Sequence, residues 1–258
     1  MIANYHTHTT RCNHAGGTDR EYVEAAVAAG MKTLGFSDHS PYIFPEEFGN
    51  YYSGFRMRPE AFPGYVQSLT ALRDEFNGKI DVHIGVEIEY YPVCFDKTEK
   101  FLKDGGVEYF LLGQHFTGNE ADAGAIYAGS QPGNREKFVE HTDTIVKCID
   151  SGKFFYIAHP DVFRYEADDV FYKETVARIC EASKKHNVPL EINLLGYRGR
   201  RYYPKPLFWQ VAGEVGAPVV IGVDAHDPGM LLDADEVAEA ARRDFAEYGL
   251  KYVEPELG

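Results

Sequence analysis

Three of the ten histidines lie in one stretch near the N-terminus, Tyr5-His6-Thr7-His8-Thr9-Thr10-Arg11-Cys12-Asn13-His14, and this stretch decides how the remaining sequence is interpreted. In an extended strand, side chains two residues apart point to the same face, so His6 and His8 present their imidazoles side by side. Such a pair can ligate a metal ion, or it can be a hydrogen-bonded pair in a core. Because a metal site needs three or four ligands, the first interpretation depends on ligands from distant segments.

Length and composition predict one globular domain over residues 1–258 with a sizeable core, since the chain is 44% hydrophobic and 26% charged. No apolar run approaches the roughly 18 to 20 residues of a membrane span, and the N-terminus lacks a basic region followed by an apolar segment. We therefore expect a cytoplasmic protein with no membrane partner. The expected oligomeric state is a monomer or a small homo-oligomer.

The net charge of -14 argues against nucleic acid as a partner. A small anionic substrate stays open, because clustered metal ions can make one pocket locally positive. The four cysteines are scattered without a Cys-x-x-Cys pair, which predicts reduced thiols rather than a disulfide framework or a zinc knuckle; they are Cys12, Cys94, Cys148 and Cys180.

Short apolar segments alternate with helical patterns along the chain. Beyond the first stretch, strands are predicted at 33–39, 80–89, 109–115, 154–158, 189–193 and 218–223, and helices at 18–30, 61–76, 95–103, 135–151, 170–186 and 206–215. About seven strand-then-helix units imply a parallel sheet, and polar residues after nearly every strand imply closure into a barrel. The active site of such a barrel lies at the C-terminal rim of the strands.

Nine potential ligands follow these strands: His6, His8, His14, His39, Glu87, His115, His159, Asp224 and His226. This number exceeds what one ion needs and suits a cluster of two or three ions with a bridging carboxylate. Nitrogen and oxygen ligands fit zinc, manganese or iron. Two other histidines are interpreted differently: His83 as a satisfied structural residue and His141 as a surface residue.

The ligand set, together with the motifs Ser37-Asp38-His39, Gly85-x-Glu87, His159-Pro160 and Asp224-x-His226, resembles the polymerase and histidinol phosphatase (PHP) superfamily. Stretches 35–41, 55–58, 85–92, 113–116 and 159–165 resemble its histidinol-phosphatase branch in particular. The resemblance implies a distorted (β/α)7 TIM-like barrel with three divalent transition metal ions. It also implies hydrolysis of L-histidinol phosphate to L-histidinol and phosphate in L-histidine biosynthesis.

By that resemblance the nine ligands divide among three metals, with Glu87 as the bridging ligand. One metal takes His6, His8, Glu87 and Asp224, a second takes Glu87, His115 and His159, and a third takes His14, His39 and His226.

The chemistry follows from the substrate class. The dianion of a phosphate monoester repels a nucleophile, so hydrolysis needs positive charge on the phosphoryl oxygens and a metal-activated hydroxide. Arg164 and Arg198 are candidates to bind the nonbridging oxygens. Asp161 is a candidate proton donor to the leaving alkoxide.

The residues that select the substrate are expected in and around a long loop. Residues 41–63 are rich in Pro, Gly, Tyr and Phe, which is typical of a lid or substrate loop. Glu89 and the loop aromatics offer a carboxylate for the ammonium group and ring faces for the imidazole of histidinol phosphate. Arg56 in the loop is a candidate substrate contact, although loop arginines are usually solvated charges. The alternative is that the loop packs its own aromatics.

Other functions remain as alternatives. A PHP-type phosphoesterase could act on phosphotyrosine proteins or nucleotides. A noncatalytic metal-binding module is the alternative from a different class, and the complete ligand set argues against it. Covalent phosphatase mechanisms are disfavoured, because the sequence has neither a Cys-x5-Arg phosphate loop nor a Gly-x4-Gly-Lys-Ser/Thr loop.

Overall fold

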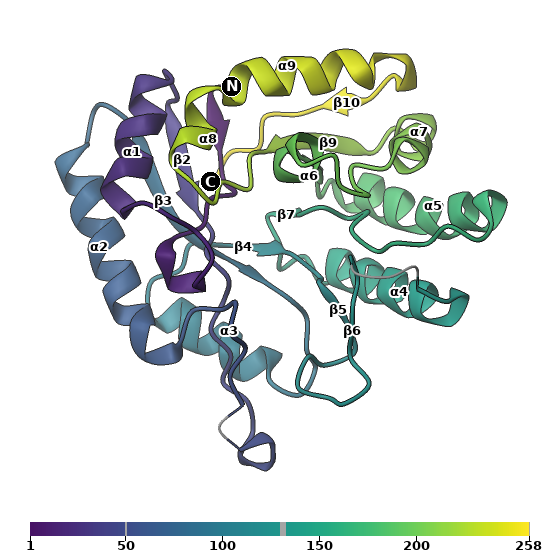
Figure 1. Ribbon diagram of the computed structural model, residues 1–258, viewed down its shortest axis with the longest axis horizontal. Helices are drawn as coiled ribbons and strands as arrows, with labels where there is room; N and C mark the ends of the chain where they lie inside the picture. The colour runs from purple at the N-terminus through teal and green to yellow at the C-terminus, as the bar shows by residue number, and fades with distance from the viewer. Residues whose placement is uncertain (50, 130–132, 258) are drawn as a thin grey trace. The chain divides into compact units, whose positions relative to one another are not determined.

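The computed structural model describes residues 1–49, 51–129 and 133–257. Contacts between residues divide the chain into two compact units. The first comprises residues 1–111 and 222–238, and the second comprises the described residues between 112 and 221 and those from 239 onward. Seven strand-then-helix pairs follow one another along the described chain, and a short strand comes after the last (Figure 1). Of the described helices, none is both long enough and apolar enough to cross a bilayer.

In the first unit, parallel strands are ordered as they occur in the chain. They are β1 (Ala3–Asn4), β2 (Thr33–Phe36), β3 (Asp81–Ile88) and β4 (Tyr109–Leu112). Ala3 pairs with Thr33, and Thr33 pairs with Asp81. The helices and 3-10 turns are η1 (Thr10–Cys12), α1 (Asp19–Ala28), η2 (Glu46–Phe48), η3 (Pro59–Ala61), α2 (Phe62–Glu75), α3 (Phe95–Asp104) and α8 (Gly229–Leu232). Helix α1 packs against both α2 and α8 (Figure 1).

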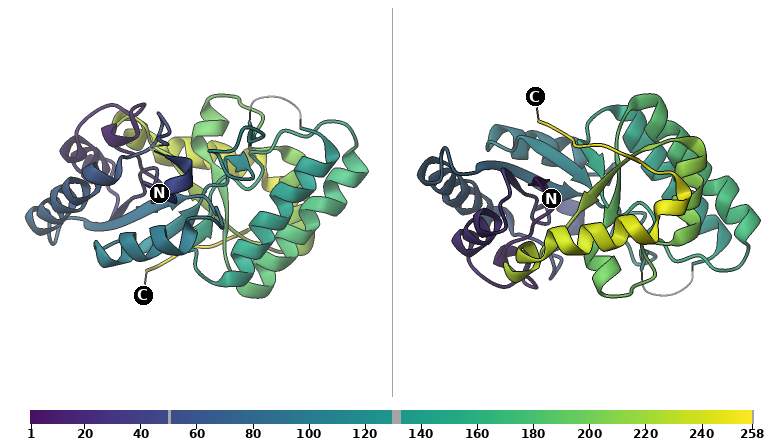
Figure 2. Two further views of the ribbon diagram at one scale, coloured as in Figure 1. Left: turned by 90° about the horizontal axis from the view of Figure 1, so that it is seen from below. Right: turned by 90° about the horizontal axis from the view of Figure 1, so that it is seen from above.

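The second unit repeats this alternation. Its strands are β7 (Tyr156–Ile157), β8 (Leu190–Asn193), β9 (Pro218–Gly222) and β10 (Lys251–Tyr252), and an antiparallel pair is formed by β5 (Phe116–Thr117) and β6 (Ile126–Tyr127). Its helices are α4 (Arg135–Ser151), α5 (Asp169–His186), α6 (Leu194–Arg198), α7 (Pro206–Val215), α9 (Ala234–Asp244), which begins in the first unit, and η4 (Ala246–Tyr248). Helix α5 packs against α4 and α7 (Figure 2).

A buried tyrosine ties three strands of the first unit together. The hydroxyl of Tyr109 donates to the carbonyl oxygens of Tyr5 at 2.8 Å and Phe36 at 2.9 Å. The ring passes so close to two neighbouring strands that a Cβ at Gly85 would lie 2.3 Å from Tyr109 Cζ and one at Gly35 2.3 Å from Tyr109 Oη. Glycine is therefore required at both positions, and the tyrosine fixes the segments that lead to His6 and His39.

Most predicted elements are present, with shifts of a few residues at their ends. The ranges 135–151 and 206–215 match α4 and α7. The predicted capping box at the start of α1 is formed, because Thr18 and Glu21 exchange side-chain to backbone hydrogen bonds. Helix α9 and strand β10 are not among the predicted elements.

The first strand, predicted to pass through the histidine stretch, is shorter than expected. Strand β1 covers only Ala3–Asn4, and η1 begins at Thr10. The residues between them are still extended, because Thr7 forms a parallel bridge with Ala225. The bridge comes from a segment more than 200 positions away, which a local pattern cannot reveal.

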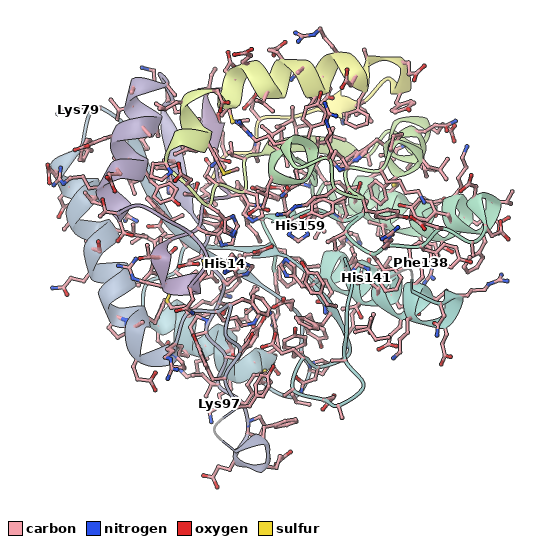
Figure 3. The ribbon with its side chains drawn as sticks, viewed as in Figure 1. His14, Lys79, Lys97, Phe138, His141 and His159 are labelled. Atoms are coloured by element: carbon pink, nitrogen blue, oxygen red, sulfur yellow. The ribbon has the colours of Figure 1, made fainter. Side chains whose placement is uncertain are left out.

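The interpretation of His141 as a surface residue is also wrong. Its side chain is 1% exposed, and Nε2 donates to the carbonyl oxygen of Gln114 at 2.8 Å. His141 follows Phe138 by about one turn of α4, and both lie on the buried face of this helix (Figure 3). Burial lowers the pKa of His141 to about 4, so the imidazole is neutral near pH 7. By contrast, His83 is a structural residue as predicted, since its Nδ1 lies 3.0 Å from Glu108 Oε2.

Arg56 is not a solvated charge. It is 2% exposed, forms an ion pair with the fully buried Glu89, and lies over the rings of Tyr42 and Phe55, 4.8 and 4.5 Å from their centroids. Tyr42 also donates its hydroxyl proton to Glu89 Oε2 at 2.6 Å. These contacts tie the long loop to the end of β3. A substrate contact of Glu89 or Arg56 would require this ion pair to open.

We expect His141 to make stability depend on pH. The pKa of an unfolded histidine is 6.5 and that of folded His141 is about 4, so the unfolded state binds more protons between these values and the folded state loses stability as pH falls. Between pH 7.5 and pH 5, the free energy of unfolding should therefore fall by about 2 kcal/mol less in His141→Gln than in the wild type. Urea unfolding at several pH values measures this difference. The control is His186→Gln, the same exchange at the exposed end of α5, where no buried imidazole is removed. Equal slopes in the wild type and His141→Gln would contradict the prediction.

The buried ion pair predicts a large effect from removing one partner. Arg56→Met removes the ion-pair partner of the buried Glu89 carboxylate, which should lower the free energy of unfolding by about 3 to 5 kcal/mol. The double variant Arg56→Met/Glu89→Gln should recover part of this loss, because no charge then stays buried. Arg58→Met, an exposed arginine over the ring of Tyr52, serves as the matched control and should cost less than about 1 kcal/mol. Wild-type stability of the Arg56→Met protein would show that Glu89 does not depend on this pairing.

Candidate metal centre

His6 and His8 lie in the extended segment between β1 and η1. Backbone hydrogen bonds from Ala225 N to His6 O at 3.1 Å and from His8 N to Ala225 O at 2.9 Å hold this segment against residues 224–226. Both imidazoles are fully buried, and their ring centroids are 5.2 Å apart. The predicted side-by-side pair is therefore formed, although a bridge rather than a long strand aligns it.

Two carboxylates face this pair. Asp224 Oδ1 lies 3.0 Å from His8 Nε2 and 3.4 Å from His6 Nε2. Glu87 Oε2 lies 3.6 Å from His8 Nε2, 3.7 Å from His6 Nε2 and 3.0 Å from His39 Nδ1. One oxygen of Glu87 is thus near three imidazoles, the arrangement expected of a bridging ligand. Asp224 has a positive φ of 53°, a conformation that a non-glycine residue adopts only where its surroundings hold it.

His14 and His226 approach each other through their Nε2 atoms, which are 3.0 Å apart. Nδ1 of His14 lies 2.8 Å from the carbonyl oxygen of Cys12, and Nδ1 of His226 lies 3.1 Å from that of Asp224. A carbonyl oxygen can only accept, so each Nδ1 carries a proton, and a neutral imidazole then has its lone pair on Nε2. Two lone pairs at this separation repel unless a proton or a metal cation lies between them. His39 completes this group, since His14, His39 and His226 each offer a nitrogen within 4.8 Å of the others.

The charges of the first unit suit a cation. Burial by itself would lower the pKa of His8, but hydrogen bonds to Asp224 and Asp38 raise it well above its usual value. Burial would raise the pKa of Asp224, but the neighbouring histidines, His6 first, hold it well below its usual value. Burial lowers the pKa of His226 to about 3, so this imidazole is neutral. A metal ion can replace the proton held by His8, and the donor set of imidazoles and carboxylates fits such an ion.

In the second unit, His115 and His159 are brought together with ring centroids 4.7 Å apart. His159, labelled in Figure 3, has a positive φ of 29°. Its backbone N–H donates to Glu191 Oε2 at 3.1 Å, and the same oxygen accepts from Asn193 Nδ2 at 2.9 Å. Glu191 therefore holds the backbone of a predicted ligand in an unusual conformation.

The other predicted site residues of this unit are Asp161, Arg164 and Arg198. Asp161 is buried, and its Oδ2 accepts from Lys205 N at 2.6 Å and from Trp209 Nε1 at 3.1 Å. Burial raises the pKa of Asp161 to about 6. Arg164 is half-buried and pairs with Glu166 at 3.0 Å, and Arg198 is the half-buried last residue of α6.

Sequence reasoning gave no role to three buried polar residues that support predicted ligands: Thr9, Asp38 and Glu191. A signal was available for Glu191, because it is a charged residue inside the apolar segment 189–193. Asp38 stands in the motif Ser37-Asp38-His39, and only its hydrogen bonds show what it contacts. All four cysteines are buried and unbridged, as predicted.

The chain resembles known proteins over most of its length. The family model of the PHP domain matches residues 4–194. A probable histidinol-phosphatase of Deinococcus radiodurans is 30% identical over 246 residues, covering 88% of this chain and 87% of the relative. A probable phosphatase of Shewanella piezotolerans is 26% identical, covering 93% of this chain and 83% of the relative.

A solved structure shares the fold. Histidinol phosphate phosphatase from Lactococcus lactis, crystallised with zinc, L-histidinol and phosphate, superposes with a TM-score of 0.69 at 18% identity, covering 98% of this chain and 95% of that one. This similarity confirms the predicted α/β fold class, and the family match confirms the resemblance drawn from the ligand motifs. The chain belongs to the PHP domain family.

Proposed function

We propose that this protein is a metal-dependent phosphomonoesterase that hydrolyses L-histidinol phosphate to L-histidinol and phosphate. The observation that carries the proposal is the convergence of five imidazoles and two carboxylates in the first unit, with the Nε2 atoms of His14 and His226 3.0 Å apart. The relative from Deinococcus radiodurans and the Lactococcus lactis structure, by their names and bound molecules, support the substrate. A role in L-histidine biosynthesis follows from that substrate.

The proposed centre takes three divalent ions, Zn, Mn or Fe. His6, His8, Glu87 and Asp224 would hold one, His14, His39 and His226 another, and the family resemblance assigns His115 and His159, with Glu87, to a third. When bound, such ions supply positive charge to phosphoryl oxygens and acidify water near neutral pH. Of these ligands, His14 is exposed, so solvent reaches its side of the centre.

Two arginines and one carboxyl group complete the proposal. Arg164 and Arg198 would bind nonbridging phosphoryl oxygens, because a planar guanidinium can donate two parallel hydrogen bonds to a phosphate. Glu166, the present partner of Arg164, would yield to the more highly charged phosphate. Asp161 would donate a proton to the leaving alkoxide. The raised pKa of Asp161, about 6, supports this role, whereas the hydrogen bonds from Lys205 and Trp209 also give it a structural one.

A broader phosphoesterase is the second candidate. The Shewanella piezotolerans relative carries only the general name of probable phosphatase, which leaves phosphotyrosine or nucleotide substrates as alternatives. A noncatalytic metal-binding module is the third, and it would bind metal without hydrolysing any ester. A substrate panel separates all three.

The first test combines metal content with substrate preference. Protein purified without chelator should carry more than one equivalent of transition metal, and chelation should abolish hydrolysis until Zn, Mn or Fe is returned. Histidinol phosphate should be hydrolysed with kcat/KM at least roughly 10²-fold above p-nitrophenyl phosphate or phosphotyrosine, since one charged contact contributes about 2 to 3 kcal/mol. Elemental analysis and steady-state kinetics measure both quantities.

The matched variants are His226→Asn, at a proposed ligand, and His83→Asn, at a structural histidine. Only the first should lower metal content. Activity that survives complete metal removal would rule out the metal mechanism. Equal rates across the panel would leave a phosphoesterase but remove histidinol phosphate as its specific substrate, and metal binding without hydrolysis would favour the noncatalytic module.

The second test concerns the arginines. Arg164→Ala and Arg198→Ala should each lower kcat/KM by roughly 10², equal to about 2.7 kcal/mol of transition-state stabilisation, and should leave metal content unchanged. Arg200→Ala, an exposed arginine two residues beyond Arg198, is the control and should behave as the wild type. Unchanged kinetics in both arginine variants would exclude them from the site.

A further inference from the structure

A buried chain of polar contacts approaches His8 from the side opposite Asp224. Thr9 and Asp38 are both fully buried, and the Thr9 hydroxyl donates to Asp38 Oδ2. Arg11 Nη1 donates to Thr9 Oγ1 at 3.2 Å. Because a guanidinium can only donate, the threonine hydroxyl must accept here and can give its own proton to the carboxylate. The contacts therefore run in one direction, from Arg11 through Thr9 to Asp38.

The outer end of this chain is anchored by two helices. Arg11 Nη1 and Nη2 donate to Asp19 Oδ1 and Oδ2 at 2.8 and 2.9 Å, a bidentate pair at the first residue of α1. Ser68 on α2 donates to the same carboxylate at 2.6 Å. The guanidinium is thus held in one orientation, and only 21% of its side chain is exposed.

The inner end faces two of the proposed ligands. Asp38 Oδ1 accepts from the backbone N–H of His39 at 2.8 Å and lies 3.5 Å from His8 Nδ1. The opposite nitrogen, His8 Nε2, is the atom that lies 3.0 Å from Asp224 Oδ1. Both ring nitrogens therefore face a carboxylate. A metal ion bound by Asp224 would take the place of a proton on Nε2, whereas Asp38 would keep the proton on Nδ1 and leave the Nε2 lone pair for the ion.

We propose that Asp38, Thr9 and Arg11 are positioning residues that set the tautomer and the orientation of His8, so that its Nε2 lone pair is directed at the metal. The inference rests on the proposed metal-binding role of His8 and Asp224. Thr9 fixes the carboxylate of Asp38 in its rotamer, and Arg11 fixes the hydroxyl of Thr9. Carboxylates that hold a ligating histidine in this way also raise its basicity, and removing them typically weakens metal binding 10- to 100-fold.

The test measures cobalt(II) affinity of the full chain by chelator competition and records the visible spectrum of the bound ion, without substrate. Asp38→Asn should bind cobalt(II) about 10- to 100-fold more weakly with an altered spectrum. Thr9→Val, which keeps the shape but loses the hydroxyl, should weaken binding about 10-fold, and Thr9→Ser, which keeps the hydroxyl, should restore it. If Asp38→Asn fails to fold, the two Thr9 variants decide the question.

The matched control for Arg11→Met is Arg20→Met. Arg20 is an exposed arginine of α1 that forms a bidentate pair with Glu75 of α2. Only Arg11→Met should weaken cobalt binding. Normal binding by Thr9→Val together with weak binding by Thr9→Ser would show that the threonine methyl group acts by packing, and would overturn the proposal. Wild-type affinity in all variants would overturn it as well, whereas a wild-type chain that binds no cobalt(II) would instead contradict the proposed function itself.

Discussion

The convergence of acceptor lone pairs is the interaction on which the rest of the first unit depends. His14 and His226 direct Nε2 at each other across 3.0 Å while their Nδ1 atoms face backbone carbonyls. Glu87 and Asp224 add negative charge beside further imidazoles. This arrangement is favourable only when protons or metal ions lie between the facing atoms, and a divalent cation can take the place of the protons. Metal binding should therefore contribute directly to the free energy of unfolding.

The scaffold that holds these groups is rigid because of a few close contacts. Tyr109 bonds to the carbonyl oxygens of Tyr5 and Phe36, the first next to His6 and the second three residues before His39. The approach is possible only because Gly35 and Gly85 lack side chains. The Tyr109 hydroxyl and the glycines at 35 and 85 therefore align the segments of β1, β2 and β3 that lead to the proposed ligands.

Several buried polar groups outside the proposed metal centre are also held by specific partners. Arg56 and Glu89 neutralise each other under the aromatic loop, and His141 stays neutral because burial disfavours its charged form. Glu191 accepts two hydrogen bonds behind His159. Each of these groups fixes a backbone segment, and each does so through a partner at least 27 positions away, except for the contact between Glu191 and Asn193.

The sequence by itself determined the elements and the ligand types. Strand-then-helix alternation was predictable because hydrophobic periodicity and capping are local, as the capping box at Thr18 shows. The ligands were predictable because each is a metal-binding residue type, and most of them lie at or just after the end of a strand. Only the tertiary structure decided which groups meet. It showed that Thr7 bridges to Ala225, that Arg56 meets Glu89, that His141 is buried, and that Asp38 lies behind His8. These pairings join residues distant in sequence, and burial depends on what other segments cover, so no local pattern carries that information.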